Sequence, residues 1–113
     1  MTKIEKYTEI VSSLLEEYAA LFNAGNSPYE KQLLIDTKHL HFQLQSVGWE
    51  GDKFSHSVML HFDIKANGKI WIQQNWTEDD VAVELLQRGV ERTDIVVGFQ
   101  PPRYRELSGY AVA

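Results

Sequence analysis

The chain has 113 residues and no cysteine, and its acidic groups outnumber its basic ones to give a net charge of −5. The absence of cysteine excludes disulfide bonds, thiolate metal sites and thiol nucleophiles. The negative charge argues against an autonomous nucleic-acid binder, whose affinity comes largely from Lys and Arg side chains that displace counterions. The length predicts one domain over residues 1–113, and the charge favours a protein partner or one that is itself basic.

No stretch of the sequence approaches the roughly 18 consecutive apolar residues of a membrane span. The first residues do not predict a signal peptide, because Glu5, Lys6 and Glu9 interrupt the early apolar positions. We therefore expect a cytoplasmic protein that does not contact a membrane.

The first predicted element is a helix over residues 3–24. Its apolar residues recur at spacings of three and four, which places them on one helical face. Thr2 and Glu5 have the spacing of a capping box, in which each side chain satisfies a free backbone N–H of the other residue. Gly25 to Pro28 end the helix.

After this helix the apolar period shortens towards two, which predicts strands. Leu33 and Ile35 indicate a first strand, and a second, half-buried strand follows where apolar and polar residues alternate over residues 40–45. The alternation slips at Ser46, which predicts a bulge or the end of the strand there. A loop is expected over residues 48–53.

A β-hairpin over residues 54–75 is the strongest prediction in the chain. Asn67-Gly68 lies between two alternating apolar runs, and this dipeptide in that setting is the clearest short-range signal for a hairpin turn. The turn is expected at residues 66–68.

The length of that turn decides which side chains share a face. A loop of two residues would set Ile64 opposite Trp71 and mix polar with apolar side chains. A loop of three residues, with Gly68 in the left-handed conformation, sets Ile64 opposite Ile70 and makes one continuous apolar face. We predict the second register. The opposite face then carries the polar and aromatic side chains Met59, His61, Asp63, Trp71, Gln73 and Asn75.

A second helix is expected after the hairpin, with Thr77 as its N-cap, three acidic residues in its first turn and Gly89 at its end. Residues 95–97 form a short apolar run, either a small strand or a turn, and Pro101-Pro102 breaks any regular ladder. The predicted fold is α+β, with an N-terminal helix, an antiparallel sheet of about four strands with a central hairpin, a second helix and a short C-terminal segment.

Two pairs of side chains could in principle ligate a metal. His39 and His41 are two residues apart in the predicted strand, and His61 and Asp63 repeat that spacing, so each pair would share one face and offer imidazole and carboxylate ligands. No helical histidine motif or clustered third ligand supports the site. A half-exposed polar sheet face explains the residues more simply, and we predict neither a metal nor a cofactor.

The sequence contains none of the common nucleotide-binding, zinc-protease or serine-hydrolase motifs. Asp63 and Lys65 match the acid-x-Lys half of a metal-dependent nuclease motif, as do Asp36 and Lys38, but matches this short arise by chance. We therefore predict no catalytic residues, and keep a nuclease as the alternative.

Trp71 is predicted to point away from the core, among polar neighbours. A large aromatic in such a setting is either an anchor for a protein partner or a second layer of core beneath a covering helix. Two arginines that flank a tyrosine near the C-terminus could meet an acidic partner or a phosphate, but they are too few to predict a nucleic-acid patch. The candidate partner-binding residues are Trp71, His61, Asp63, Gln73, Arg103, Tyr104 and Arg105.

Several stretches spread over nearly the whole chain carry a family resemblance. They are Asp36-Thr37, His41 to Leu44, Gly48-Trp49, His61 to Lys65, Gly68 to Asn75 with Thr77-Glu78, Asp94 to Phe99 with Pro101-Pro102, and Gly109 to Ala113. In these stretches the chain resembles the XisI family, the fdxN element excision controlling factors of cyanobacteria. Trp76 departs from the pattern, where a smaller polar residue is expected.

The resemblance implies a small α+β protein that acts with a XisH-type partner in controlling excision of a DNA element by a site-specific recombinase. It brings no established catalytic residues, and DNA would be contacted indirectly, through the recombination machinery. One hypothesis is thus a non-enzymatic regulator that works through protein contacts. The other is a metal-dependent nuclease or DNA-binding subunit that uses Asp63 and Lys65. An exposed sheet face or edge would also allow a homo-oligomer.

Overall fold

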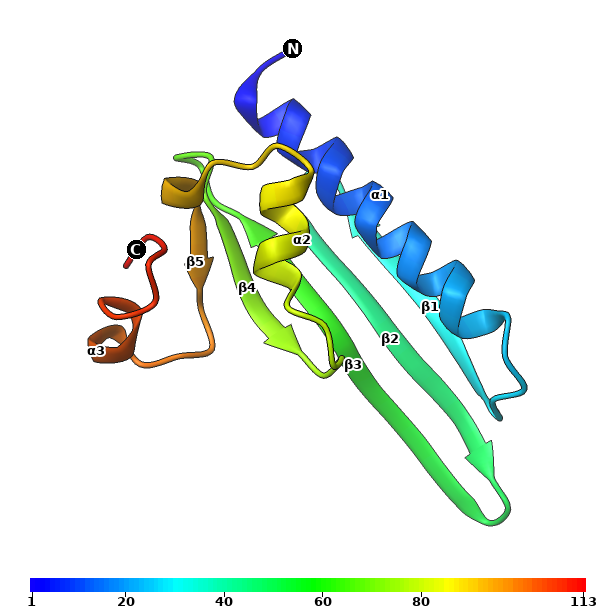
Figure 1. Ribbon diagram of the computed structural model, residues 1–113. Helices are drawn as coiled ribbons and strands as arrows, with labels where there is room; N and C mark the ends of the chain where they lie inside the picture. Colours follow the sequence, from blue (N-terminus) through cyan, green and yellow to red (C-terminus); the bar gives the residue numbers. More distant parts are fainter.

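The computed structural model describes all 113 residues, arranged as a five-stranded sheet with two helices on one of its faces (Figure 1). The predicted α+β class is confirmed, and the sheet has one strand more than the expected four. The elements in chain order are α1 (Lys3–Asn23), β1 (Tyr29–Asp36), β2 (His41–Glu50), β3 (Lys53–Ile64), β4 (Ile70–Asn75), α2 (Val81–Gln87), a 3-10 turn η1 (Arg92–Asp94), β5 (Ile95–Val97) and α3 (Pro102–Arg105).

The strands lie in the sheet in the order in which they occur along the chain. β1 to β4 form an antiparallel meander, whereas β5 pairs with β4 in parallel. A parallel neighbour needs a crossover connection, and α2 supplies it between β4 and β5. The short apolar run at residues 95–97 is therefore the fifth strand, and the sheet is mixed rather than purely antiparallel.

The central hairpin has the predicted three-residue turn. The Lys65 N–H donates to the Lys69 carbonyl at 3.0 Å, and Gly68 takes a φ of 84°, in the left-handed region that favours glycine. Ile64 consequently lies opposite Ile70. The predicted continuous apolar face is confirmed, because the register places apolar residues of β3 and β4 on the same side of the sheet.

The predicted irregularity at Ser46 is wrong. β2 continues to Glu50, and the register between β2 and β3 shifts instead between Leu44 and Gln45, which leaves Met59 of β3 as the extra residue. Ser46 is buried on the core side, in phase with Leu44. Trp49 breaks the apolar alternation because it lies on the opposite face of the same uninterrupted strand.

The first helix has the predicted cap, whereas the second does not. The Thr2 hydroxyl accepts the Glu5 N–H at 3.1 Å. In α2 the cap is Asp80, whose carboxylate accepts the N–H groups of Ala82 and Val83 at 3.1 and 3.3 Å, so the predicted cap at Thr77 is wrong. Each of the three successive acidic residues could cap α2, and the sequence alone does not determine which of them does.

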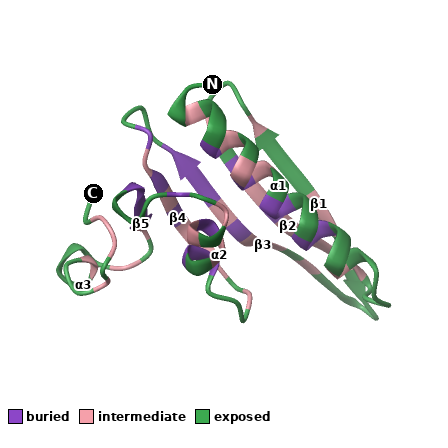
Figure 2. Cartoon of the chain, turned by 45° about the horizontal axis from the view of Figure 1, so that its top comes forward, coloured by how far each residue is buried: buried purple, intermediate pink, exposed green.

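The hydrophobic core lies between the sheet and the two helices. α1 packs across β1, β2 and β3, and α2 adds its buried side chains to the same cluster. Purple segments of α1, α2 and the central strands face one another in Figure 2. The largest fully buried side chains are Phe42, Phe62, Leu14, Leu15, Leu44, Leu60, Ile70, Ile72, Leu85 and Ile95. We call the sheet face away from α1 and α2 the open face.

A buried polar contact fixes the start of α1 against the start of β5. The Asp94 carboxylate accepts hydrogen bonds from the Tyr7 hydroxyl at 2.6 Å and from the Lys3 amine at 2.8 Å. Burial and then the hydrogen bond to Asp94 raise the pKa of Tyr7 to about 12. The contact joins residues at opposite ends of the chain, so only the folded structure brings them together. No helix of the structure has both the length and the apolar character needed to cross a membrane.

Candidate functional site

Polar side chains from three neighbouring strands meet on the open face. Strand pairing sets His41 of β2 opposite Asp63 of β3, and Asp63 opposite Trp71 of β4. His61 lies two residues before Asp63 and therefore projects from the same face. The register thus gathers three of the predicted binding residues, His61, Asp63 and Trp71, and adds His41.

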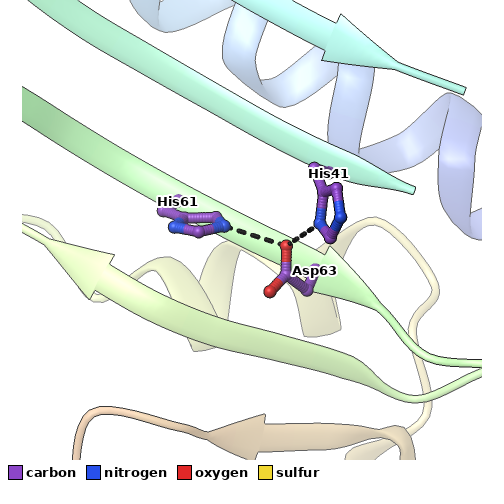
Figure 3. Close-up of side chains that lie close together, drawn as sticks. All are labelled: His41, His61 and Asp63. Carbon is purple, nitrogen blue, oxygen red and sulfur yellow. Dashed lines mark hydrogen bonds and ion pairs between the residues drawn. The ribbon is translucent and has the colours of Figure 1, made fainter. Parts of the chain in front are cut away.

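Asp63 is the centre of this group (Figure 3). Its Oδ1 accepts hydrogen bonds from His41 Nδ1 at 2.7 Å and from His61 Nε2 at 2.8 Å. Its Oδ2 accepts one from the Gln73 amide at 3.1 Å. Because an ionised carboxylate only accepts, both imidazole nitrogens that face it carry hydrogen. We call these four residues the Asp63 cluster.

The surroundings keep Asp63 ionised. Burial by itself would raise the pKa of this carboxyl, but the hydrogen bonds from His41, His61 and Gln73 together outweigh it, and the pKa lies below its usual value. Asp63 is buried while His41 is exposed. The cluster therefore presents imidazole groups to solvent above a carboxylate that is held in place from three directions.

The predicted pairing of His39 with His41 is wrong. His39 lies in the turn between β1 and β2, where its ring bonds the Asp36 carboxylate at 2.9 Å. The partner of His41 is instead Asp63, from a strand that begins twelve residues later. The strand boundaries could not be read from the alternation alone, because the turn residues continue it.

The cluster is the part of the molecule where a metal ion could find three ligands. The donor atoms of His41, His61 and Asp63 lie within 4.8 Å of one another, and two imidazoles with one carboxylate form a donor set that suits zinc and related ions. The same atoms already satisfy one another by hydrogen bonds. The arrangement is thus accounted for without a metal, and the expectation of none stays a prediction.

Gln73 is the extra residue of β4 in its pairing with β3. The register between β3 and β4 shifts between His61 and Phe62, so His61 lies opposite Gln74 rather than Gln73. As a result Asn75 lies opposite Leu60, and its side chain bonds the Asp79 carbonyl at 2.8 Å. The expectation that Asn75 continues the row formed by Trp71 and Gln73 is therefore wrong.

Trp71 is half-buried, although neither α1 nor α2 covers it. The Arg105 guanidinium lies over its ring with 4.9 Å to the centroid, and the Lys65 amine lies at 5.7 Å. A Cβ at Gly98 would come within 2.9 Å of the ring, which shows how closely the chain after β5 approaches it. Trp71 is therefore held on one side by the C-terminal segment, a third arrangement beside the two considered from the sequence.

The predicted tail residues have different surroundings. Arg105 donates to the carbonyl groups of Gln100, Val112 and Gly98 at 2.9, 3.2 and 3.3 Å, so it holds the C-terminal segment together. Tyr104 is half-exposed beside Arg103, whose guanidinium lies 4.9 Å from the tyrosine ring centroid. Arg105 therefore belongs to the same surface as Trp71, whereas the side chains of Arg103 and Tyr104 project from α3.

The two acid-x-Lys matches have structural roles in this fold. Asp63 is committed to the cluster, and Lys65 lies over Trp71. Asp36 accepts the N–H groups of Lys38 and His39, both at 3.0 Å, and so stabilises the turn after β1. Neither acid lies in a group with a second carboxylate, whereas metal-dependent phosphoryl transfer is commonly supported by several.

The model of the XisI protein family matches residues 1–112 of the chain. The chain belongs to the XisI family. The XisI assignment is supported by a crystal structure of a XisI-like protein from Anabaena variabilis ATCC 29413, which is 44% identical, with a TM-score of 0.89 over 97% of this chain and 99% of that chain.

A second XisI structure, that of the fdxN element excision controlling factor XisI from the same organism, is 30% identical, with a TM-score of 0.87 over 99% of this chain and 100% of that chain. The search of curated proteins finds no match. The resemblance proposed from the sequence motifs is therefore confirmed, and the fold is that of experimentally determined XisI-type structures.

Proposed function

We propose that this chain is a non-enzymatic accessory protein that controls excision of a DNA element by a site-specific recombinase, and that it acts by binding a XisH-type protein. The observation that carries the proposal is the match to XisI along nearly the whole chain, together with the fdxN element excision controlling factor among its relatives. The net charge of −5 favours contact with a protein rather than directly with DNA.

The open face beside the C-terminal segment is the proposed contact surface. It combines a rigid aromatic side chain, Trp71, with two cations and the imidazoles of the Asp63 cluster. Aromatic and arginine side chains are enriched at protein interfaces and among the residues that contribute most to binding.

Copurification with a XisH-type protein tests this proposal. We expect the two proteins to elute together from a size-exclusion column. His61→Ala should weaken association tenfold or more, as measured by calorimetry, because its side chain lies at the proposed surface and forms no part of the core.

Trp49→Ala is the matched control. Trp49 is a more exposed aromatic on the open face, but it lies at the distant end of the β2–β3 hairpin, where it packs on Phe54. Its removal should leave the affinity unchanged. Equal losses in the two variants would contradict the proposed surface.

A metal-dependent nuclease or DNA-binding subunit is the alternative function, and the metal-compatible geometry of the Asp63 cluster is the observation that favours it. The alternative predicts that the chain on its own cleaves DNA, or binds it tightly at about 150 mM salt, where nonspecific electrostatic binding is weak. That result, with no association to a XisH-type protein, would replace the first proposal.

A further inference from the structure

The strand β1 forms an edge of the sheet and pairs with no other strand on its outer side. Its central residues are exposed and apolar, with exposed fractions of 38% for Leu33, 43% for Leu34 and 37% for Ile35; β1 is the green arrow of Figure 2. The other edge is protected, because Val96 of β5 forms a bridge with Ala111. A long apolar edge with free backbone groups is a template for pairing with another strand.

The backbone groups at this edge can be accounted for one by one. In an antiparallel ladder every second residue directs its N–H and C=O away from the neighbouring strand. Asn23, at the end of α1, accepts the N–H of Lys31 at 3.0 Å and donates to its carbonyl at 3.2 Å, so Lys31 is one of these outward residues. By alternation the others are Tyr29, Leu33 and Ile35.

The outward groups near the start of β1 are already occupied. The Tyr29 N–H donates to the Ser27 hydroxyl at 3.1 Å, and the Tyr29 carbonyl accepts the Lys31 amine at 3.3 Å. Asn23 occupies both groups of Lys31. No group of the chain bonds the outward N–H or C=O of Leu33 or Ile35. The edge is therefore open to a partner strand only over its second half.

We propose that a second copy of this chain pairs with this edge, β1 against β1 in antiparallel orientation, around a twofold axis that passes beside Leu34. Leu33 of each copy then lies opposite Ile35 of the other copy, so that the two free residues of each strand exchange hydrogen bonds. The two Leu34 side chains meet at the axis. An axis perpendicular to the sheet keeps both sets of helices on one face and joins the strands of the two copies in one sheet.

The charges and the occupied groups select this register over its neighbours. Pairing around Leu34 sets Gln32 opposite Asp36 of the second copy, and Glu30 then lies beyond the end of that strand. The register centred on Ile35 would set Leu33 opposite Thr37, which lies in the turn after β1. The register centred on Leu33 would require the groups of Lys31 that Asn23 occupies. It would also set Glu30 opposite Asp36, two like charges that destabilise a cross-strand pair.

The oligomeric state tests the interface first. Light scattering on a size-exclusion column should give twice the mass of the 13.0 kDa chain, and Leu34→Asp should shift the protein to a monomer, because it places two carboxylates against each other at the axis. Phe54→Asp is the control at a similarly exposed position of the open face, and it should remain a dimer. A monomeric parent protein, or a Leu34→Asp variant that stays dimeric, would overturn the proposal.

Single cysteines test the register, and the chain has none of its own. Leu34→Cys should crosslink two copies under mild oxidation, because facing residues at a non-hydrogen-bonded antiparallel position have Cα atoms about 4.5 Å apart, within the range of a disulfide. Gln32→Cys should not, since its two copies are displaced by four residues, roughly 13 Å along the strand. Crosslinking at Leu33→Cys in place of Leu34→Cys would contradict the register. If Leu34→Asp fails to fold, the crosslinking of the cysteine variants still tests whether the dimer forms.

Discussion

Replacing Phe62 by alanine is expected to lower the free energy of unfolding by about 3–5 kcal/mol, the usual cost of removing a buried phenylalanine. Phe62 has no exposed surface and lies in β3 between Phe42 of β2 and Ile72 of β4, beneath the helices. Its removal leaves a cavity at the centre of the core. A domain of this kind has roughly 5–15 kcal/mol of total stability, so the loss would be a large fraction of it.

Urea denaturation followed by circular dichroism would measure the loss. Phe54→Ala is the matched control, because Phe54 is the same residue type on the same strand and is 50% exposed. It packs on Trp49 at the hairpin end, and we expect its replacement to cost about 1 kcal/mol or less. Similar losses for the two variants would mean that the core is not centred where β2, β3 and β4 meet.

The second large effect is expected at Asp94. Asp94→Ala should lower the free energy of unfolding by about 2–3 kcal/mol, because it leaves the buried Tyr7 hydroxyl without its acceptor and removes a charge-assisted contact to Lys3. Thermal or urea unfolding at neutral pH measures it. Asp94→Asn should lose less, because its amide oxygen can still accept one of the two hydrogen bonds.

The same carboxylate predicts how stability depends on pH. Burial would raise the pKa of Asp94, but the hydrogen bonds from Lys3 and Tyr7 lower it below its usual value. A lowered pKa in the folded state means that the stabilisation is present above the unfolded-state pKa of about 3.9 and is lost as the pH falls through the folded-state value. We expect unfolding free energies measured from pH 7 downward to fall below about pH 4.

Asp94→Asn should flatten this decline without abolishing it, since the pKa of Asp63 is also lowered in the fold. An unchanged slope in the variant would show that Asp94 does not contribute to the acid sensitivity. Because the two carboxylates lie on opposite sides of the sheet and share no partner, their contributions should be additive.

The elements that the sequence predicted well are those governed by local rules. The periodicity of α1 and its Thr2 cap, the alternation of β2, and the Asn67-Gly68 turn each depend on neighbours within a few residues. The choice of a three-residue turn was correct because only that register keeps the apolar residues of β3 and β4 on one face. Short motifs along the chain also sufficed to recognise the XisI family.

The composition of the Asp63 cluster could be predicted only in part. His61 and Asp63 are two residues apart in one strand, so their shared face followed from the period of a strand. The contact of His41 with Asp63 depends on how β2 pairs with β3, and the extra residue Met59 in that pairing left no local signal. Gln73 joins through a second register shift. Bulges change which residues face one another, so sequence spacing alone does not determine the cluster.

The sequence by itself determined the class of fold, the central hairpin with its two faces, and the family. Only the tertiary structure decided that α1 and α2 leave the open face uncovered, that Arg105 and Gly98 pack against Trp71, and that β1 is an edge with two residues unpaired. Each of these depends on contacts between segments far apart in the chain. Such contacts form because burial and hydrogen bonding over the whole molecule outweigh local preferences, and no local pattern records them.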